Sequence, residues 1–584
     1  MLRTLLLSIL ALILASARPA RSAPVQLTEQ APITITNVAS GVILIDFGKV
    51  AFGNLILTPP ANASNTITIH FGEALSGERI DRQPPGNVRY AVAEAFPAGG
   101  KPIRVAPEPN RRNTKQPAAV LTPPEWGVLL PFRWVEVENW PGELRSDQIR
   151  RSAAFARDWN EQAAAVETSD PMLNRVWDLC HYSIKATTFA GVYVDGDRER
   201  VAYEADAYLS QLGRFYTDGD AQMARDTFDR LLKQPTWPTE WAPHMIFMAY
   251  ADWMQTGDTN WLAAHYAALK LKLQLDRELP DGLIGSTEAQ IKRGDVVDWP
   301  ESERDGFVFT HVNTVVNAFH LRALLLMSRL ARALNQTADA DDYAARERTA
   351  RAAFQEKLFD PARGLYRDGE GTDHDSLHAN LFPLAFGLAP ADQRARIAQW
   401  LGDRGMKCSV YAAQYLLEGL FENGAEAEAI ALMTAPGDRS WRHMVESGTT
   451  ITWEAWDQRY KPNQDWNHAW GAAPANLLPR FVLGAQPLTP GWKRALIRPH
   501  PGTLAQAMGK VPTVLGPISI QWTNSPGFKL SLALPPHMTA QVDIPAQGDF
   551  TGIVVNGKSV PAKHAGQWWV LEKSLTGSAV IETR

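Results

Sequence analysis

The middle of the chain, residues 168–483, carries the pattern of helices joined by short turns. Residues 315–334 repeat apolar side chains at helical spacing, with Thr314 as a candidate N-cap, and residues 343–359 form a second helical run that Asp360-Pro361 ends. The repeated order of helix, short turn, helix and longer loop predicts stacked helical hairpins that close into a toroid. An open superhelix is the alternative.

Short β-branched runs flank this helical part on both sides. Before it, runs such as Val42-Ile43-Leu44-Ile45 are broken by Gly, Pro and Asn, and residues 84–124 form a long excursion rich in Pro, Arg and Asn. After it, runs such as Ala540-Gln541-Val542-Asp543-Ile544 alternate apolar with polar side chains. We therefore expect a multidomain protein. Its domains are an N-terminal β-sandwich over residues 24–165, the helical toroid over residues 166–485 and a C-terminal β-sandwich over residues 486–584.

The first 23 residues have the features of a secretory signal peptide. Arg3 supplies the positive charge, residues 5–14 the apolar region, and Ala15-Ser16-Ala17 or Ala20-Arg21-Ser22 the small-residue cleavage site. The apolar run is short for a membrane span, which needs about 20 residues. We therefore expect an exported protein, periplasmic or extracellular, with no membrane segment after the signal is removed.

Composition excludes some partners and cofactors. The net charge of -5 gives no basic footprint, so we expect no nucleic-acid partner. The 20 tryptophans suit stacking on sugar rings, but tryptophan is also a routine core residue. Cys180 and Cys408 form no disulfide framework, although they could pair once. No phosphate-binding loop, dinucleotide fingerprint, zinc-spaced Cys/His set or EF-hand loop occurs, so we expect neither cofactor nor metal; the oligomeric state is left open.

Residues 195–206 place five acids and two arginines in twelve positions, between an apolar aromatic run and a helical run. Arginines in such a cluster hold some carboxylates ionised, whereas a poorly solvated carboxyl has a raised pKa. The segment is therefore either the lining of a cleft or a solvated loop with ion pairs. A second acidic and aromatic cluster at residues 449–457 favours the cleft, because two such clusters far apart in the sequence suit a reaction that needs two opposed carboxyl groups.

The first cluster contains an Asp before an Arg/Glu/Arg segment and a second Asp seven residues after the Glu. These residues are Asp195, Arg198, Glu199, Arg200 and Asp206. On this motif the chain resembles bacterial α-L-rhamnosidases of glycoside hydrolase family 78, from about residue 30 to the end. Further matching segments are Gly294-Asp295-Val296-Val297-Asp298-Trp299, Gly448-Thr449-Thr450, Trp453-Glu454-Ala455-Trp456 and Asn467-His468.

The chain departs from the family pattern in two places. The linker Gly196-Asp197 after the first Asp is shorter than usual, and Tyr203-Glu204-Ala205-Asp206 stands where the family commonly has Trp-x-Gly-Asp. Both departures concern the shape of the sugar pocket more than the chemistry.

The resemblance implies an (α/α)6 catalytic domain and an inverting hydrolase that releases terminal α-L-rhamnose from glycosides or oligosaccharides. Inversion needs an acid and a base roughly 6.5–9.5 Å apart, with room for a water molecule. The resemblance suggests Glu199 as the acid and Glu454 as the base. The expected substrate-binding residues are Asp195, Arg198, Tyr203, Asp206, Asp298, Trp299, Trp453, Trp456 and His468. Alternatively, Asp206 is a helix N-terminal acid, and His468 has a structural role.

Two other functions are compatible with the sequence. The first is a different (α/α)6 glycosidase or lyase, which would be expected to show a different acid segment and, for uronates, an extra basic residue. The second is a non-catalytic glycan-binding protein, which is disfavoured because both candidate carboxylates are present. An aromatic stretch, Trp237, Trp241, His244 and Phe247, either borders the mouth of the site or is core at helical spacing.

Overall fold

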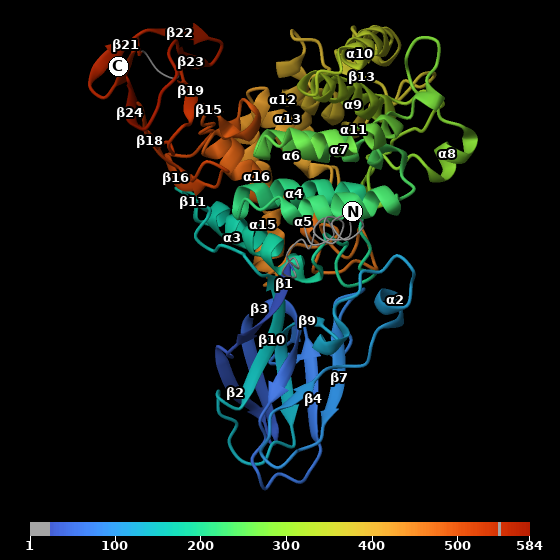
Figure 1. Cartoon of the computed structure of the whole chain (residues 1–584), viewed down its shortest axis with the longest axis vertical. Helices are drawn as coiled ribbons and strands as arrows, with labels where there is room; N and C mark the ends of the chain where they lie inside the picture. The colour runs from blue at the N-terminus through green and yellow to red at the C-terminus, as the bar shows by residue number, and fades with distance from the viewer. Residues whose placement is uncertain (1–23, 547–549) are drawn as a thin grey trace, which may run out of the picture.

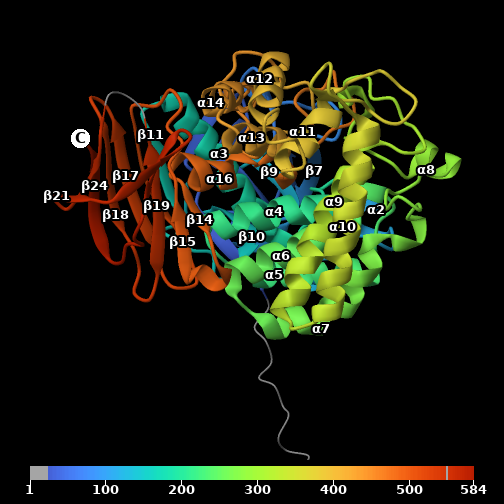
Figure 2. The same cartoon turned by 90° about the horizontal axis from the view of Figure 1, so that it is seen from above.

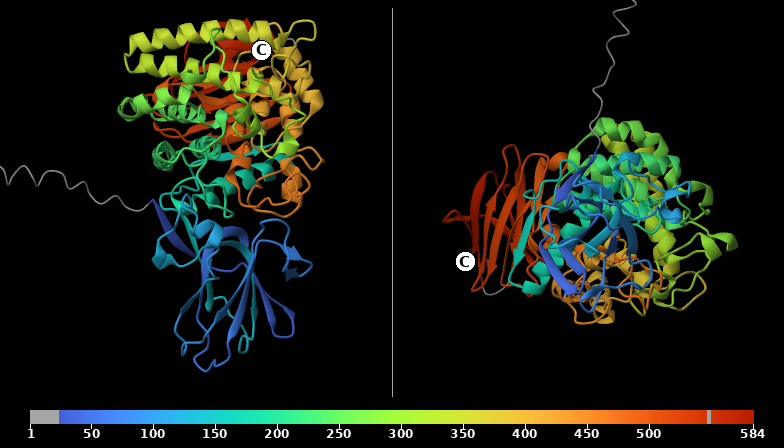
Figure 3. Two further views of the ribbon diagram at one scale, coloured as in Figure 1. Left: turned by 90° about the vertical axis from the view of Figure 1, so that its right-hand side faces the viewer. Right: turned by 90° about the horizontal axis from the view of Figure 1, so that it is seen from below.

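A computed structural model describes residues 24–546 and 550–584, which form an N-terminal β domain, a helical domain and a C-terminal β domain (Figure 1). The N-terminal domain lies under one end of the helical domain, and the C-terminal domain packs against its side (Figure 3). Within the described residues no helix is long and apolar enough to cross a membrane. The expected signal peptide, residues 1–23, lies outside the described part of the chain.

The N-terminal domain is a sandwich joined by one long strand. Strand β3 pairs with β2 through its first half, with β10 and β8 through its second half, and with β9 in both, with a register shift between Asp46 and Ala51. The main strand order is β1-β10-β3-β9-β4-β7, and β2 and β8 pair with β3 outside this path. Buried side chains such as Ile45, Phe71 and Phe132 fill the core between the two halves. The strands are β1 (Val25–Gln30), β2 (Thr34–Ala39), β3 (Val42–Leu57), β4 (Ile67–Gly72), β7 (Tyr90–Ala95), β8 (Ile103–Val105), β9 (Leu130–Glu138) and β10 (Ile149–Ala156).

The helical domain is a closed ring of hairpins. In the described residues the inner helices α4, α6, α9, α11, α13 and α16 pack each on the next, and α16 returns to α4. Each inner helix also packs on an outer one, in the order α5, α7, α10, α12, α14 and α3 (Figure 2). The toroid is thus confirmed, and the open superhelix was wrong.

The bounds of these helices are α3 (Pro171–Ala186), α4 (Glu204–Thr217), α5 (Gln222–Lys233), α6 (His244–Thr256), α7 (Thr259–Lys270), α9 (Thr314–Ala333), α10 (Thr337–Leu358), α11 (Leu377–Ala385), α12 (Arg394–Arg404), α13 (Ala413–Glu422), α14 (Glu426–Met433) and α16 (Pro474–Leu477). Shorter helices outside the ring are α2 (Arg111–Thr114), α8 (Glu288–Arg293) and α15 (Trp441–Glu446).

Local sequence explains where helices α9 and α10 begin and end. The side chain of Asn313, not Thr314, caps α9 by accepting a hydrogen bond from the Val316 N–H at 2.9 Å. Helix α10 starts six residues before the expected position, since its first turns are polar and lack an apolar stripe. It ends just before Asp360-Pro361, because proline cannot continue a helix.

The C-terminal domain consists of two sheets with strand orders β11-β16-β17-β18-β24-β20-β21 and β14-β15-β19-β23-β22 among the described residues. Strand β11 (Ala165–Thr168) precedes the helices in sequence but pairs with β16 of this domain and packs beside α3. The sequence had placed the start of the helical toroid here. The remaining strands are β14 (Ala485–Pro487), β15 (Arg494–Ile497), β16 (Gln506–Val511), β17 (Ile518–Asn524), β18 (Phe528–Ala533), β19 (Thr539–Pro545), β20 (Ile553–Val555), β21 (Lys558–Val560), β22 (Ala562–Ala565), β23 (Trp568–Leu571) and β24 (Ser578–Thr583).

The two cysteines do not form the disulfide that the sequence left open. Cys180 lies on α3, Cys408 precedes α13, and in the described structure both are free and buried. Burial raises the pKa of both thiols well above the ordinary value, so neither is a reactive thiolate.

Candidate active site

A cavity of about 190 Å³ lies at the end of the ring that faces the N-terminal domain. This is smaller than the roughly 300–1,000 Å³ of pockets for drug-sized ligands, and it suits a single sugar ring. Eight of the residues expected from the sequence line it: Asp195, Arg198, Glu199, Tyr203, Asp206, Trp299, Glu454 and His468.

The first acidic segment folds back on itself at the start of α4. The Asp195 N–H donates to the Val201 carbonyl at 2.9 Å, and Asp195 Oδ1 accepts from the Val201 N–H at 2.9 Å. Gly196 between them has φ of +83°, and a Cβ there would lie 2.8 Å from Asn467 Oδ1. Because only glycine tolerates both conditions, the segment can pack closely against Asn467. Asn467 belongs to the second acidic segment, residues 449–468, which carries Glu454.

Arg198 lies between the two candidate catalytic carboxyl groups. Its Nη1 is 2.5 Å from Glu454 Oε2, its Nε is 3.6 Å from Glu199 Oε1, and its Nη2 is 3.8 Å from Asp195 Oδ2. Glu199 and Glu454 are 255 positions apart in the sequence, yet they face one cavity with the guanidinium group between them.

Glu199 is held in its ionised form. Burial alone would raise its pKa, but Arg198, Arg112 of the N-terminal domain and the Tyr203 hydroxyl together lower the pKa below the ordinary value. Arg112 Nη2 lies 2.5 Å from Oε1, and the Tyr203 hydroxyl donates to Oε2 at 3.2 Å. The Glu199 side chain is 21% exposed, so one edge of it faces solvent.

The pKa of Glu454 is shifted in the opposite direction. Its side chain is 2% exposed, and its Oε1 lies 3.5 Å from Lys461 Nζ. Burial and the nearby Asp465 carboxylate raise the pKa of Glu454 above the ordinary value, against the opposing effect of Arg198, His468 and Lys461. Without substrate, Glu454 is therefore more easily protonated than Glu199, which is the reverse of the order expected from their assigned roles.

His468 joins the two acidic segments as a buried cation. Its Nε2 is 2.7 Å from Asp206 Oδ1 on α4, and its Nδ1 is 3.4 Å from Asp465 Oδ1. Burial alone would lower the pKa of His468, but the nearby carboxylates of Asp206 and Asp465 raise it to about 10. Asp206 and His468 thus hold one another and fix the second segment to the start of α4.

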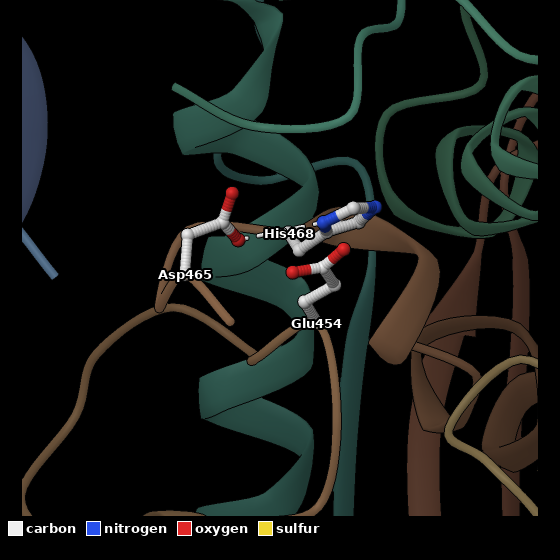
Figure 4. A group of neighbouring side chains, drawn as sticks. All are labelled: Glu454, Asp465 and His468. Atoms are coloured by element: carbon white, nitrogen blue, oxygen red, sulfur yellow. Dashed lines mark ion pairs between the residues drawn. The ribbon is translucent and has the colours of Figure 1, made fainter. Parts of the chain in front are cut away.

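Glu454, Asp465 and His468 could also be considered as a metal site, because one ligand atom from each lies within 4.8 Å of the others (Figure 4). The charges around them argue against this use. The His468 imidazolium carries a proton that a metal ligand would have to lose. Arg198 and Lys461 already provide two cations to Glu454. We therefore assign no metal to this cluster.

The raised pKa of His468 predicts a loss of stability in alkaline solution. A histidine whose pKa rises from 6.5 to about 10 on folding stabilises the fold fully below pH 6.5, and this contribution disappears as the pH rises towards 10. We expect the free energy of unfolding to fall by up to about 5 kcal/mol over this interval, and expect His468→Gln to remove most of this slope. Urea unfolding at several pH values measures it.

The matched control is His500→Gln. His500 is also buried, but burial lowers its pKa to about 3, so it stays neutral over the same interval. This variant should keep the wild-type slope. An equal alkaline slope in wild-type protein and His468→Gln would contradict the charge assigned to His468.

Three expected substrate contacts are corrected by the structure. Asp298 is fully buried and accepts hydrogen bonds from Ser409 and from His378 Nε2, the latter at 2.7 Å. Trp453 stacks on Trp466 with ring centroids 4.8 Å apart. The indole of Trp456 is fully buried and donates to the Cys408 carbonyl. These side chains do not line the cavity; they support the loops that do.

Four further residues line the cavity: Trp237, Trp241, Val296 and Trp470. Trp237 is 59% exposed, so the aromatic stretch that contains it borders the mouth and is not only core. The Val296 loop is held by Glu240, which accepts hydrogen bonds from the N–H groups of Val296 and Val297. Val297 has φ of +61°, a strained value for a β-branched residue, and such strain is common where a loop is fixed for function.

The closed ring of hairpins, with two opposed carboxyl groups in a cavity at one end, defines the class of six-hairpin glycosidases. The profile of the bacterial alpha-L-rhamnosidase 6 hairpin glycosidase domain matches residues 161–482, and that of the bacterial alpha-L-rhamnosidase C-terminal domain matches residues 484–558. The chain therefore belongs to the bacterial α-L-rhamnosidase family.

Individual relatives agree with this assignment. The chain is 24% identical to an alpha-L-rhamnosidase of Alteromonas sp., over 94% of this chain and 60% of that protein. It is 23% identical to one of Streptomyces avermitilis, over 90% and 50%. It therefore spans only about half to three-fifths of the length of these relatives.

Solved structures show the same fold. An α-L-rhamnosidase from Dictyoglumus thermophilum superposes with a TM-score of 0.79 at 18% identity, covering 96% of this chain and 64% of that chain. The Streptomyces avermitilis enzyme complexed with L-rhamnose superposes with a TM-score of 0.77 at 20% identity, covering 96% and 54%.

Proposed function

We propose that this protein is an inverting glycosidase that releases terminal α-L-rhamnose from glycosides or oligosaccharides, with Glu199 as general acid and Glu454 as general base. The observation that carries the proposal is the meeting of these two remote glutamates at one cavity of single-sugar size, with Arg198 between them. An inverting mechanism needs two carboxyl groups that are held apart and do not touch, so that a water molecule can enter between the base and the sugar.

The roles follow from position within the cavity. A sugar ring that fills the cavity directs its leaving group towards the mouth, where the partly exposed Glu199 lies. The hydrolytic water attacks from the opposite side, where Glu454 is almost fully buried. The low pKa of Glu199 in the free site means that substrate must weaken its contacts with Arg112 or Arg198 before it can donate a proton.

Recognition of the sugar combines free polar atoms with an apolar wall. Within the described structure, buried Asp195 Oδ2 and Arg198 Nε have no hydrogen-bond partner, although both residues line the cavity. A buried polar atom without a partner is costly, so these atoms are suited to bind sugar hydroxyl groups. Trp241, Val296 and Trp299 provide an apolar wall for the methyl group of rhamnose.

The site of action follows from the N-terminal sequence. The features of residues 1–23 support export, so we propose that the mature enzyme works in the periplasm or outside the cell.

Hydrolysis of p-nitrophenyl α-L-rhamnoside tests the proposal. Wild-type protein should release p-nitrophenol, and NMR should show β-L-rhamnose as the first product, because the reaction inverts the anomeric centre. Other p-nitrophenyl glycosides serve as controls. Preferential turnover of a glucoside or fucoside would favour a different glycosidase. Release of α-L-rhamnose as the first product would overturn the inverting mechanism. Binding of L-rhamnose without turnover of any glycoside would indicate a glycan-binding protein.

A further inference from the structure

The N-terminal β domain contributes a charged residue to the active site. Helix α2, between β8 and β9, lies at the end of this domain that faces the ring (Figure 1), and its Arg112 Nη2 is 2.5 Å from Glu199 Oε1. We propose that Arg112 is a positioning residue that orients the Glu199 carboxyl group and sets the pH range in which it can donate a proton. This inference rests on the proposed function, in which Glu199 is the general acid.

The α2 loop is bound firmly to the catalytic segment. Gln116 Nε2 donates to the Glu199 carbonyl at 2.8 Å, buried Asn113 donates from Nδ2 to the Asp197 carbonyl at 2.6 Å, and the Val120 N–H donates to the Arg200 carbonyl at 2.8 Å. These contacts fix the backbone that carries Arg112 relative to Glu199. The ion pair is therefore part of a built interface, unlike a chance contact between two surface side chains.

The same domain also holds the second acidic segment. Arg89 Nε is 2.6 Å from Asp197 Oδ2, and Asp197 in turn donates its N–H to Asn467 Oδ1 at 2.7 Å. Asn467 Nδ2 donates at 3.0 Å to Glu73, which directly follows strand β4 of the β domain. The Asn87 N–H of the same domain donates to the Gln464 carbonyl at 2.8 Å. The β domain thus bridges the segments that carry Glu199 and Glu454.

Several charged or titratable groups surround Glu199. They are Arg112 from α2, Arg198 and Asp195 from its own segment, Tyr203 at the start of α4, and Glu454 and His468 across the cavity. Arg112 differs from Arg198 because its side chain is 49% exposed, whereas that of Arg198 is 9% exposed. Loss of Arg112 should let burial raise the pKa of Glu199, with Arg198 still present.

The test compares pH profiles of kcat/KM for wild-type enzyme, Arg112→Met, Arg112→Lys and the matched control Arg111→Met, which changes the exposed neighbour on the same helix. In the free site the pKa of Glu199 lies below that of Glu454, so the acidic limb of kcat/KM reports Glu199 and the alkaline limb reports Glu454. We expect Arg112→Met to move the acidic limb upward by about 0.5–1 pH unit, since the arginine is half-exposed and its effect is partly screened. Arg112→Lys should lie near wild type, and Arg111→Met should match it.

Leaving-group dependence separates orientation of the acid from a general structural defect. We expect Arg112→Met to lower kcat about 3–10-fold for an alkyl α-L-rhamnoside, whose poor leaving group needs protonation. A dinitrophenyl rhamnoside leaves without an acid and should be turned over at the wild-type rate. If Arg112→Met does not fold, Arg112→Gln, which keeps a donor but lacks the charge, should give the same shift.

An acidic limb that is the same in wild type, Arg112→Met and Arg111→Met would overturn the inference. If wild-type protein hydrolyses no α-L-rhamnoside, the proposed function fails separately. In that case ¹³C NMR titration of labelled glutamate carboxyl groups measures the pKa of Glu199 directly, with Glu199→Gln to assign the resonance. The same Glu199 pKa in wild type and Arg112→Met would then overturn the role of Arg112.

Discussion

Glu454→Gln is expected to lower kcat on p-nitrophenyl α-L-rhamnoside by about a thousand-fold or more, in line with the upper range for a lost general base. The amide keeps the size of the side chain and can still accept the hydrogen bond from Arg198, but it cannot take a proton from water. Glu199→Gln should cause a similar loss on an alkyl α-L-rhamnoside, whose poor leaving group needs protonation. Initial rates and KM on purified, folded variants measure both effects.

The leaving group distinguishes the two roles. A dinitrophenyl rhamnoside needs little help from an acid, so it should restore much of the activity of Glu199→Gln and little of that of Glu454→Gln. The opposite result would reverse the roles and follow the order of the pKa values in the free site, where Glu454 is the more easily protonated group. Full activity of both variants would refute the pair.

A matched control lies in the ring but outside the cavity. Glu418 on α13 is a partly buried glutamate paired with an arginine, its Oε1 lying 2.6 Å from Arg480 Nη2. Glu418→Gln should alter stability while leaving kcat per folded molecule near the wild-type value. It thus separates loss of a buried charge from loss of the reacting group.

The toroid could be predicted from the sequence because helical periodicity and turn residues are local signals that repeat along the chain. The paired acidic segments could be found for a related reason, since each is a dense local cluster. The edge strand β11 could not be assigned, because its partner β16 lies more than three hundred positions further along the chain. The N-cap of α9 was misplaced by only one residue, at Thr314 instead of Asn313, because either side chain can cap a helix.

Side-chain direction limited the prediction of the site. Asp298 and Trp299 are neighbours, yet Trp299 lines the cavity and Asp298 turns into the core towards His378. Trp453 and Trp456 flank Glu454 but pack on Trp466 and Trp441. The sequence carries the residue types, whereas the tertiary packing decides which of them face a ligand.

Arg112 carried no sequence signal at all. It lies in the long excursion of residues 84–124, which contains several arginines in a segment without periodicity. Its partner Glu199 belongs to another domain, so the contact depends on how the β domain docks on the ring. No local pattern encodes such an arrangement.

Arg198→Met is expected to abolish measurable turnover and to destabilise the fold by about 3–5 kcal/mol at neutral pH, because removing one member of a buried ion pair leaves the other uncompensated. Three carboxyl groups lie within 4 Å of this guanidinium, and Glu454 and Asp195 already have pKa values raised by burial. Loss of the cation raises these two pKa values further.

The pH dependence of this destabilisation identifies its cause. A carboxyl group whose pKa is raised by folding costs little while both states are protonated, and the cost grows as the pH rises through the unfolded pKa towards the folded one. Urea unfolding should therefore show a small difference from wild type near pH 4 and a large one at pH 7. Arg480→Met, which breaks the partly buried pair with Glu418 outside the cavity, should destabilise the protein but keep its activity per folded molecule. If Arg198→Met lowers the free energy of unfolding equally at both pH values, the arginine stabilises the fold through packing. Its charge would then not be what stabilises the two glutamates in this arrangement.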